Sequence, residues 1–466
     1  MQKYTPLFLS FLIGITLWFI PPLEGITLQG WHLFSIFIAT IFAIVFNALP
    51  MGVAALTALF ALVITHTLTF HEAFNGFSNH VVWLIVFAFF IARGFIKTGL
   101  GSRISYLFMY FLGKKTLGLG YGLAAADFIL SSSIPSSTAR SGGVILPIVE
   151  SLSESFDSKG HSPSANRMGG YLALVGFHTS CISSAMFITA MAVNPLIVEI
   201  ASGMGVHLTW ASWAIAAFIP GILSLIAIPL LIYAIHPPEI HFTPDAQVFA
   251  KAKLNAMGKI KREEWIMIAT FFLLIGLWIA GPYIHLEATV TALFGLVILM
   301  LSNILTWKEI RSEEGAWETL IWFGVLLTMA GYLQQFGVTA VIGSKLIPLV
   351  EQMHWTSGFL IIGFFYFYSH YFFASILAHV SAMYAAFLAL AIQIGAPPYL
   401  AALVLGYFSS LFGCLTQYSC GPAALLFGAG YVSAKNWWKV GFIVSVANIA
   451  IWVIFGGLWW KILGLW

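Results

Sequence analysis

The chain has 466 residues, of which 60% are hydrophobic and only 8% are charged, and its net charge is +3. Apolar runs long enough to cross a bilayer recur from one end to the other, which excludes a soluble globular or disordered protein. The composition therefore predicts an all-α, polytopic membrane protein.

Hydrophobic runs, cut at glycine, proline and charged residues, predict about eleven transmembrane helices. The first run follows Lys3 as a signal peptide would, but no small-residue cleavage site precedes Trp31 and the chain re-enters the membrane at once. We therefore interpret it as the first membrane helix. The expected helices are 6–20, 32–48, 52–68, 81–97, 168–200, 210–235, 265–283, 287–305, 320–341, 398–431 and 440–466.

Two further hydrophobic segments, about 117–148 and 356–392, are each interrupted in the middle by polar or small residues. Either arm alone is short for a hydrocarbon core about 30 Å thick. We therefore expect each segment to be a re-entrant hairpin that enters and leaves the membrane on one side.

Lysine and arginine indicate the topology, because they concentrate in cytoplasmic segments of membrane proteins. With the N-terminus inside, the 20 Lys and Arg residues fall at cytoplasmic ends, except Arg140, Lys345 and Lys461. The longest loop, about 236–264, is basic, and we interpret it as a cytoplasmic connection between two halves. This role is commoner than binding nucleic acid or lipid headgroups. The C-terminus is expected outside.

The two halves of the chain repeat one another. Ser136-Ser-Thr-Ala-Arg140 aligns with Ser375-Ile-Leu-Ala-His379, 239 residues further on, so each hairpin carries serine, alanine and a basic residue in the same order. An odd number of predicted helices separates the hairpins, so they open to opposite sides. An inverted repeat with broken elements is the architecture of secondary transporters, which work by alternating access. Two further pairs have nearly the same spacing: Trp83 with Trp322, and Gly99 with Gly337.

The residues at the interruptions favour an anionic substrate. A cation at bilayer depth such as Arg140 normally faces a cavity, a partner or a bound anion. Pro135 followed by three hydroxyl residues is typical of a helix start, where free N–H groups attract a carboxylate. We expect similar starts after Thr179 and at Pro422. The candidate binding residues are Ser136, Ser137, Thr138, Arg140, Ser183, Ser184, Ser375, His379, Ser419, Cys420, Gly421 and Pro422.

Structural explanations compete with this site. Serine in a membrane helix often bonds only the preceding turn, and Arg140 could pair with Asp127, the one acid clearly within the apolar core. His178 and His370 are interpreted as structural. No metal-ligand spacing or disulfide pattern occurs, so we expect no metal and free buried thiols at Cys181, Cys414 and Cys420.

Several motifs resemble the divalent anion/sodium symporter (DASS) family. The run Ile134-Pro-Ser-Ser-Thr-Ala-Arg-Ser-Gly-Gly-Val-Ile-Leu-Pro-Ile148 is similar to its first signature. The segments 370–384, 421–431, 183–195 and 31–40 also fit, and the first two resemble its exchanger branch. The resemblance therefore runs nearly from end to end.

The resemblance implies a homodimeric elevator carrier in which scaffold helices hold a moving transport domain. Family members carry Ser-Asn-Thr in each hairpin to bind substrate carboxylates, and nearby carbonyl groups bind sodium in the symporters. This chain departs from that pattern, because its second copy is Ser375-Ile376-Leu377. The implied division is scaffold 1–97, first transport half 98–205, linking helix, loop and second scaffold part 206–341, second transport half 342–432, and C-terminal helix 433–466.

We therefore expect a secondary transporter, not an enzyme, that exchanges malate, succinate, fumarate, 2-oxoglutarate, tartrate or citrate without sodium. Arg140 and His379 would supply the positive charge that sodium supplies in the symporters. The expected setting is a bacterial inner membrane, with no cofactor and no nucleic acid. A sodium-coupled dicarboxylate symporter is the main alternative, and an integral-membrane enzyme or an anion channel is a distant one.

Overall fold

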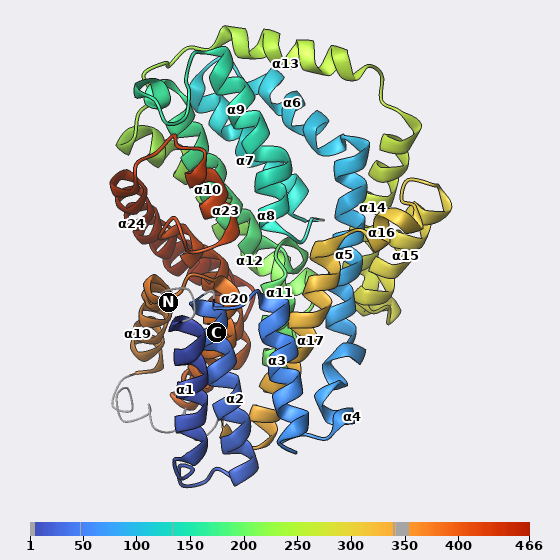
Figure 1. Cartoon of the computed structure of the whole chain (residues 1–466). Helices are drawn as coiled ribbons and strands as arrows, with labels where there is room; N and C mark the ends of the chain where they lie inside the picture. The colour runs from blue at the N-terminus through green and yellow to red at the C-terminus, as the bar shows by residue number, and fades with distance from the viewer. Residues whose placement is uncertain (1–4, 47, 133, 339–340, 342–353) are drawn as a thin grey trace.

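The computed structural model describes residues 5–46, 48–132, 134–338, 341 and 354–466, which form helices joined by short turns (Figure 1). Within these residues there is no β-sheet, and the one strand-like contact is an isolated bridge between Lys115 and Phe242. The all-helical prediction is confirmed. Lys3, Lys345 and the beginning of the expected second transport half, 342–353, lie outside the described residues.

The N-terminal part contains two antiparallel helices, α1 and α2, followed by three further helices. Capping side chains and a glycine define where several of these helices begin or end. Thr27 caps α2 and Asn79 caps α5 by accepting a backbone N–H, and Gly99 ends α5 in the left-handed region at φ 75°. Such caps satisfy backbone groups that a helix end leaves unpaired. The helices are α1 (Thr5–Phe19), α2 (Leu28–Val45), α3 (Met51–Ile64), α4 (Phe70–Ala73) and α5 (His80–Thr98).

Long apolar helices also form the middle and the end of the chain. Seven of the described helices are long and apolar enough to cross a membrane, and several shorter apolar helices accompany them. These helices agree with the predicted class, whereas the full number of crossings stays a prediction. The longer helices here are α12 (Trp210–Ile235), α14 (Arg262–Ile284), α17 (Glu314–Gln335) and α24 (Ala434–Ile451), which continues through a π-helical turn into α25 (Gly457–Ile462). Helix α15 (Ala288–Leu301) is one of the shorter apolar helices.

Hydropathy did not predict two of the longer described helices. Helix α6 (Leu100–Leu112) follows α5 directly, and α13 (Pro244–Met257) occupies the segment expected to be a loop and lies across one end of the molecule (Figure 1). Proline at the first position favours the start of α13. Its buried Ala246 and Ala250 lie one turn apart on the face that packs against α6. Polar composition concealed this helix, because only a narrow stripe of it is buried.

The two predicted hairpins contain the same arrangement of helices. In each, a short tip follows the first helix, and a serine caps a second helix that includes one π-helical turn. The tip of the second hairpin contains a 3₁₀ turn, Ser369–Phe372. The π-helical turns, Ser141–Ile145 and Val380–Tyr384, are 239 residues apart, which is also the spacing of the two sequence motifs. The first set is α7 (Thr116–Ser131), α8 (Ser137–Arg140) and α9 (Leu146–Ser155); the second is α19 (Trp355–Tyr368), α20 (Ile376–His379) and α21 (Ala385–Gln393).

Each half also contains one broken helix. In the first half α10 (Gly169–Met186) ends at Phe187, a short 3₁₀ turn follows, and α11 (Val193–Gly203) begins. In the second half α22 (Pro398–Leu411) breaks before α23 (Gly421–Gly428). Helix α10 is buried along its whole length and packs against α7, α12 and α22. The broken elements therefore surround the centre of the fold.

Candidate functional site

A cavity of about 520 Å³ lies where the four chain breaks meet. Each break contributes a short stretch to its wall: 135–138 and 374–377 from the hairpin tips, and 191–193 and 420–422 from the broken helices. The remaining wall comes from the turn between α2 and α3, from α5 and from α17. It consists of Ile44, Leu49, Pro50, Met51, Phe89, Gly315, Glu318, Thr319 and Trp322.

The start of the first hairpin's second helix forms one side of the cavity. Ser136 has an extended backbone, and its Oγ accepts a hydrogen bond from Ala139 N at 3.1 Å. The Ser136 hydroxyl proton is therefore available to a ligand, and the exposed Thr138 lies in the first turn of this helix. A helix start with free N–H groups and hydroxyls is suited to an anion.

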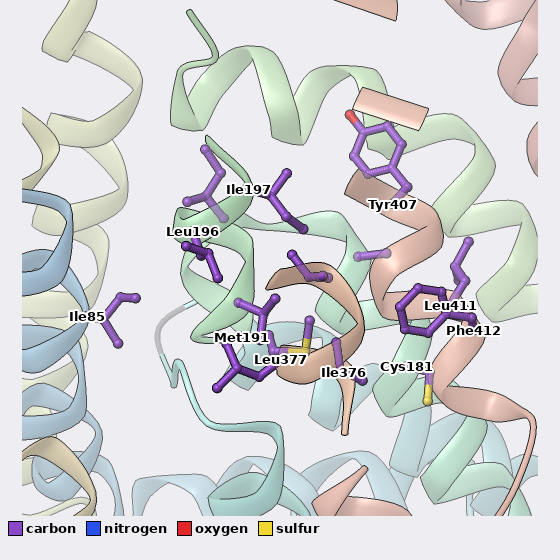
Figure 2. Packing of buried hydrophobic residues seen from close by; sticks show 14 of the residues in the cluster. Ile85, Cys181, Met191, Leu196, Ile197, Ile376, Leu377, Tyr407, Leu411 and Phe412 are labelled. Atoms are coloured by element: carbon purple, nitrogen blue, oxygen red, sulfur yellow. The ribbon is translucent and has the colours of Figure 1, made fainter. Parts of the chain in front are cut away.

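The corresponding start in the second repeat is more apolar. Ser375 caps α20 through Ala378 N at 3.4 Å, as Ser136 caps α8. Ile376 and Leu377 are only 7% and 4% exposed, and they belong to the same buried hydrophobic cluster as Met191 and Leu196 (Figure 2). Ile376 and Leu377 therefore contribute apolar packing to this wall of the cavity. Ser375 provides the one side-chain hydroxyl at the start of α20.

The second broken helix brings the two repeats into contact. Residues 420–422 line the cavity at the start of α23, with Pro422 near the first helical position. A side-chain carbon added at Gly421 would collide with the Thr138 hydroxyl of the first repeat. Glycine is therefore required at this position by the close approach of a residue that lies far away in sequence.

Behind the first hairpin tip, Arg140 is fully buried and almost fully hydrogen-bonded. Its Nε pairs with Asp127 Oδ1 at 3.1 Å, and its Nη2 donates to Ser184 Oγ at 2.9 Å. Its Nη1 donates to two backbone carbonyl oxygens, those of Ile134 and Ala190, at 2.6 Å each. Arg140 therefore joins the hairpin tip to the break in the first broken helix and does not line the cavity.

A pair of histidines holds the equivalent place in the second repeat. His379 Nδ1 lies 3.1 Å from His370 Nδ1, and its Nε2 lies 3.0 Å from Ser369 Oγ. His370 Nε2 lies 3.2 Å from the carbonyl oxygen of Ser419, at the second break. Both rings are buried and stack on Phe412. His370, interpreted above as structural, is thus the histidine that contacts the break.

The break in the first broken helix lies later than expected. The sequence predicted a helix start after Thr179, but Ser183 and Ser184 remain in the last turns of α10, and the helix ends at Phe187. Asn194 stabilises the break by donating to the carbonyl oxygens of Ser184 and Phe187, at 2.7 and 2.9 Å. Asn194, which follows the apolar end of α10, was the residue in the sequence that could have indicated the position of this break.

The predicted binding residues fall into two groups. Those at the cavity wall are Ser136, Ser137, Thr138, Ser375, Cys420, Gly421 and Pro422. Those placed behind the wall are Arg140, Ser183, Ser184, His379 and Ser419, all of which are buried. The wall residues of α17, including Glu318 and Thr319, were not predicted, because an isolated polar residue near a helix end has no distinguishing pattern.

The sequence matches the family described as the sodium:sulfate symporter transmembrane region over residues 1–466. It is 50% identical to YflS of Bacillus subtilis (strain 168), named as a proposed malate transporter, over 100% of this chain and 97% of that protein. It is 46% identical to the chloroplastic dicarboxylate transporter 1 of Spinacia oleracea, over 99% and 82% of the two chains. It is 32% identical to the citrate/succinate antiporter of Escherichia coli (strain K12), over 96% and 95%.

Proposed function

The chain belongs to the sodium:sulfate symporter transmembrane family, and we propose that it exchanges di- or tricarboxylates across the membrane without sodium. The named activities of its relatives support carboxylates as the substrate class and a transporter, not an enzyme, as the protein class. Malate, succinate, fumarate, 2-oxoglutarate, tartrate and citrate are all small enough for a site built from two helix starts. One of these relatives is named as an antiporter, which supports exchange.

The single observation that carries the sodium-independent part is the position of the Arg140 guanidinium. In related carrier architectures, sodium is held by carbonyl oxygens that helix breaks leave without helical partners. Arg140 Nη1 already donates to two such oxygens, those of Ile134 and Ala190. We infer that the permanently charged guanidinium takes the place of a bound cation beside the substrate, while Asp127 holds its orientation.

The histidine pair supports the same interpretation in the second repeat. The charge that we propose for His379 requires both of its ring nitrogens to carry a proton; they face His370 Nδ1 and Ser369 Oγ, and Ser369 Oγ also bonds the Tyr366 carbonyl oxygen. His370 then donates its own N–H to the Ser419 carbonyl oxygen. We propose that this pair replaces a second cation, with the aromatic ring of Phe412 against its face.

Substrate binding follows from the cavity wall. We propose that Ser136, Ser137 and Thr138 bind one carboxylate, and that Ser375 together with the start of α23 binds the other. Free N–H groups at helix starts and hydroxyl donors stabilise an anion without a lysine in contact with it. One relative is named as an antiporter, and we propose exchange for this chain on that ground.

We propose that the two hairpins are re-entrant and that they move with α10, α11, α22 and α23 as an elevator domain. The helices α3, α5 and α17 would then stay fixed in a homodimeric scaffold of a bacterial inner membrane, with the N-terminus inside. The cavity faces the end of α17 that follows Lys308 and Arg311. The positive-inside rule favours a cytoplasmic position for this end, and we propose on that ground that this conformation is inward-facing.

Contacts at the opposite ends of α5 and α17 support this conformation. Asn79 donates to Glu199 of α11 at 2.8 Å, and Gln334 donates to the Gly203 carbonyl oxygen. These bonds join the proposed moving domain to the proposed scaffold on the outer side. They surround a polar cavity of about 680 Å³ that lacks the hairpin tips in its wall.

We expect purified protein in liposomes to exchange internal for external carboxylate, with little uptake into vesicles that contain no counter-anion. The measurement is uptake of labelled succinate against a panel of unlabelled internal anions, with and without a sodium gradient. Protein-free liposomes are the control. Robust sodium-driven uptake into empty vesicles would overturn the proposal in favour of a sodium-coupled symporter, and rapid unsaturable conduction would favour a channel.

Replacing Thr138 with alanine is expected to weaken carboxylate binding. A hydrogen bond to a charged group contributes about 1.5–3 kcal/mol, so the dissociation constant should rise by roughly tenfold to a hundredfold. Isothermal titration and thermal melting measure binding and folding together. Ser141→Ala is the matched control, because the buried Ser141 hydroxyl bonds none of the residues that the structure describes. Equal affinity in Thr138→Ala and Ser141→Ala would show that the Thr138 hydroxyl does not bind the carboxylate.

A further inference from the structure

One acid faces the proposed substrate. Among the described residues that line the 520 Å³ cavity, Glu318 is the only one with a charged side chain. The residue is exposed, and no hydrogen bond or ion pair engages its carboxylate within the described part of the chain. It lies on the face of α17 that also presents Thr319 and Trp322 to the cavity. A free carboxylate is an unexpected neighbour for an anion.

Glu318 belongs to a different part of the fold from the groups that would bind the anion. The hydroxyls and helix starts come from the hairpin tips and the broken helices, whereas α17 packs against α3 and α5. Glu318 itself lies beside Gly52 at the start of α3. If the hairpin tips and broken helices move while α17 stays fixed, the Glu318 carboxylate faces the substrate only in the present conformation. In the opposite conformation the substrate would lie away from Glu318.

We propose that Glu318 is a specificity-determining residue that lowers the affinity for anions at the cytoplasmic face of the carrier. The decrease in affinity is larger for anions of higher charge. This inference rests on the proposed exchange of carboxylates by an elevator movement. Repulsion between fixed charges is proportional to the charge of the ligand. Glu318 therefore promotes release of a carboxylate into the cytoplasm and discriminates against a trianion relative to a dianion.

The dependence on charge predicts a quantitative pattern for Glu318→Gln. If the neutral side chain tightens the binding of dianionic succinate by about fivefold, trianionic citrate should gain about elevenfold, because the interaction energy scales as three to two. The gain should shrink as ionic strength increases, since an open, hydrated cavity is screened by salt. Affinity at the outer face should stay unchanged.

The test compares the two faces of the membrane in a bacterial host that lacks its own carboxylate carriers. Exchange in whole cells gives the apparent affinity of the outer face, and exchange in inverted membrane vesicles gives that of the cytoplasmic face. Both are measured for succinate and for citrate, at low and high salt. Glu314→Gln is the matched control, because Glu314 is exposed on the same helix but does not line the cavity.

The expected result is tighter binding by Glu318→Gln at the cytoplasmic face alone, larger for citrate than for succinate, with Glu314→Gln equal to wild type. Unchanged affinities, an equal change at both faces, or weaker binding would each overturn the role of Glu318 while wild-type exchange continues. No carboxylate exchange by a well-folded wild-type protein would instead refute the proposed function, and the inference with it.

Discussion

Replacing Arg140 with alanine is expected to abolish carboxylate exchange. The substitution removes the positive charge behind the first hairpin tip and frees the carbonyl oxygens of Ile134 and Ala190, which Arg140 now holds together. Arg140→Lys should restore only part of the activity, because one ammonium group cannot reproduce a planar guanidinium that bonds Asp127, Ser184 and both carbonyls. Counterflow in liposomes measures the effect.

Stability must be separated from transport in this experiment. Arg140→Ala leaves Asp127 buried without its partner, and breaking a buried ion pair costs about 3–5 kcal/mol. The double variant Arg140→Ala/Asp127→Ala removes both charges, so we expect it to recover much of the lost melting temperature without recovering exchange. Wild-type exchange by the well-folded double variant, with or without sodium, would show that the pair is only structural.

Replacing Gly421 with alanine is expected to reduce exchange by about tenfold or more. The new methyl group would collide with the Thr138 hydroxyl, so either α23 or the start of α8 must move. Interiors are close-packed and absorb such overlap only by shifting their neighbours, which costs about 1–3 kcal/mol. The shift would separate the two helix starts that we propose as the carboxylate site. Succinate binding and counterflow are the measurements.

Helix α23 provides its own control for this prediction. Gly428 lies at the end of the same helix, and a side-chain carbon added there meets nothing within 4 Å. Gly428→Ala should therefore exchange and melt like the wild type. If Gly421→Ala also retains normal binding, the contact with Thr138 is not part of the substrate site.

Much of the local structure around the site follows from short-range sequence signals. Ser136 and Ser375 each cap a helix by accepting the N–H three residues further on, and such caps always bond an N–H within the first turn. The 239-residue repeat was visible as two motifs, and it reappears as two equivalent π-helical turns. Gly99 and Gly337, which the repeat also paired, both have positive φ near 75°.

Other elements were hidden because they depend on neighbours. Hydropathy did not reveal α6 or α13, since α13 buries a narrow apolar face against α6, and α6 packs against both α13 and α7. The first helix break lies after Ser184 because Asn194 reaches back to the carbonyl oxygens of the helix end. A side chain that satisfies a backbone group several residues away cannot be located from helix propensity.

The sequence by itself determined the membrane setting, the all-helical class, the repeat and the candidate residues at the helix starts, because hydropathy, capping and internal spacing are properties of adjacent or regularly repeated residues. Only the tertiary structure decided which polar groups face the cavity. It buries Arg140 against Asp127, places His370 at the second break and brings Glu318 of α17 opposite the hairpin tips. These contacts join segments far apart in the chain, and the direction of a side chain across such a gap is set by how helices pack, which local sequence does not specify.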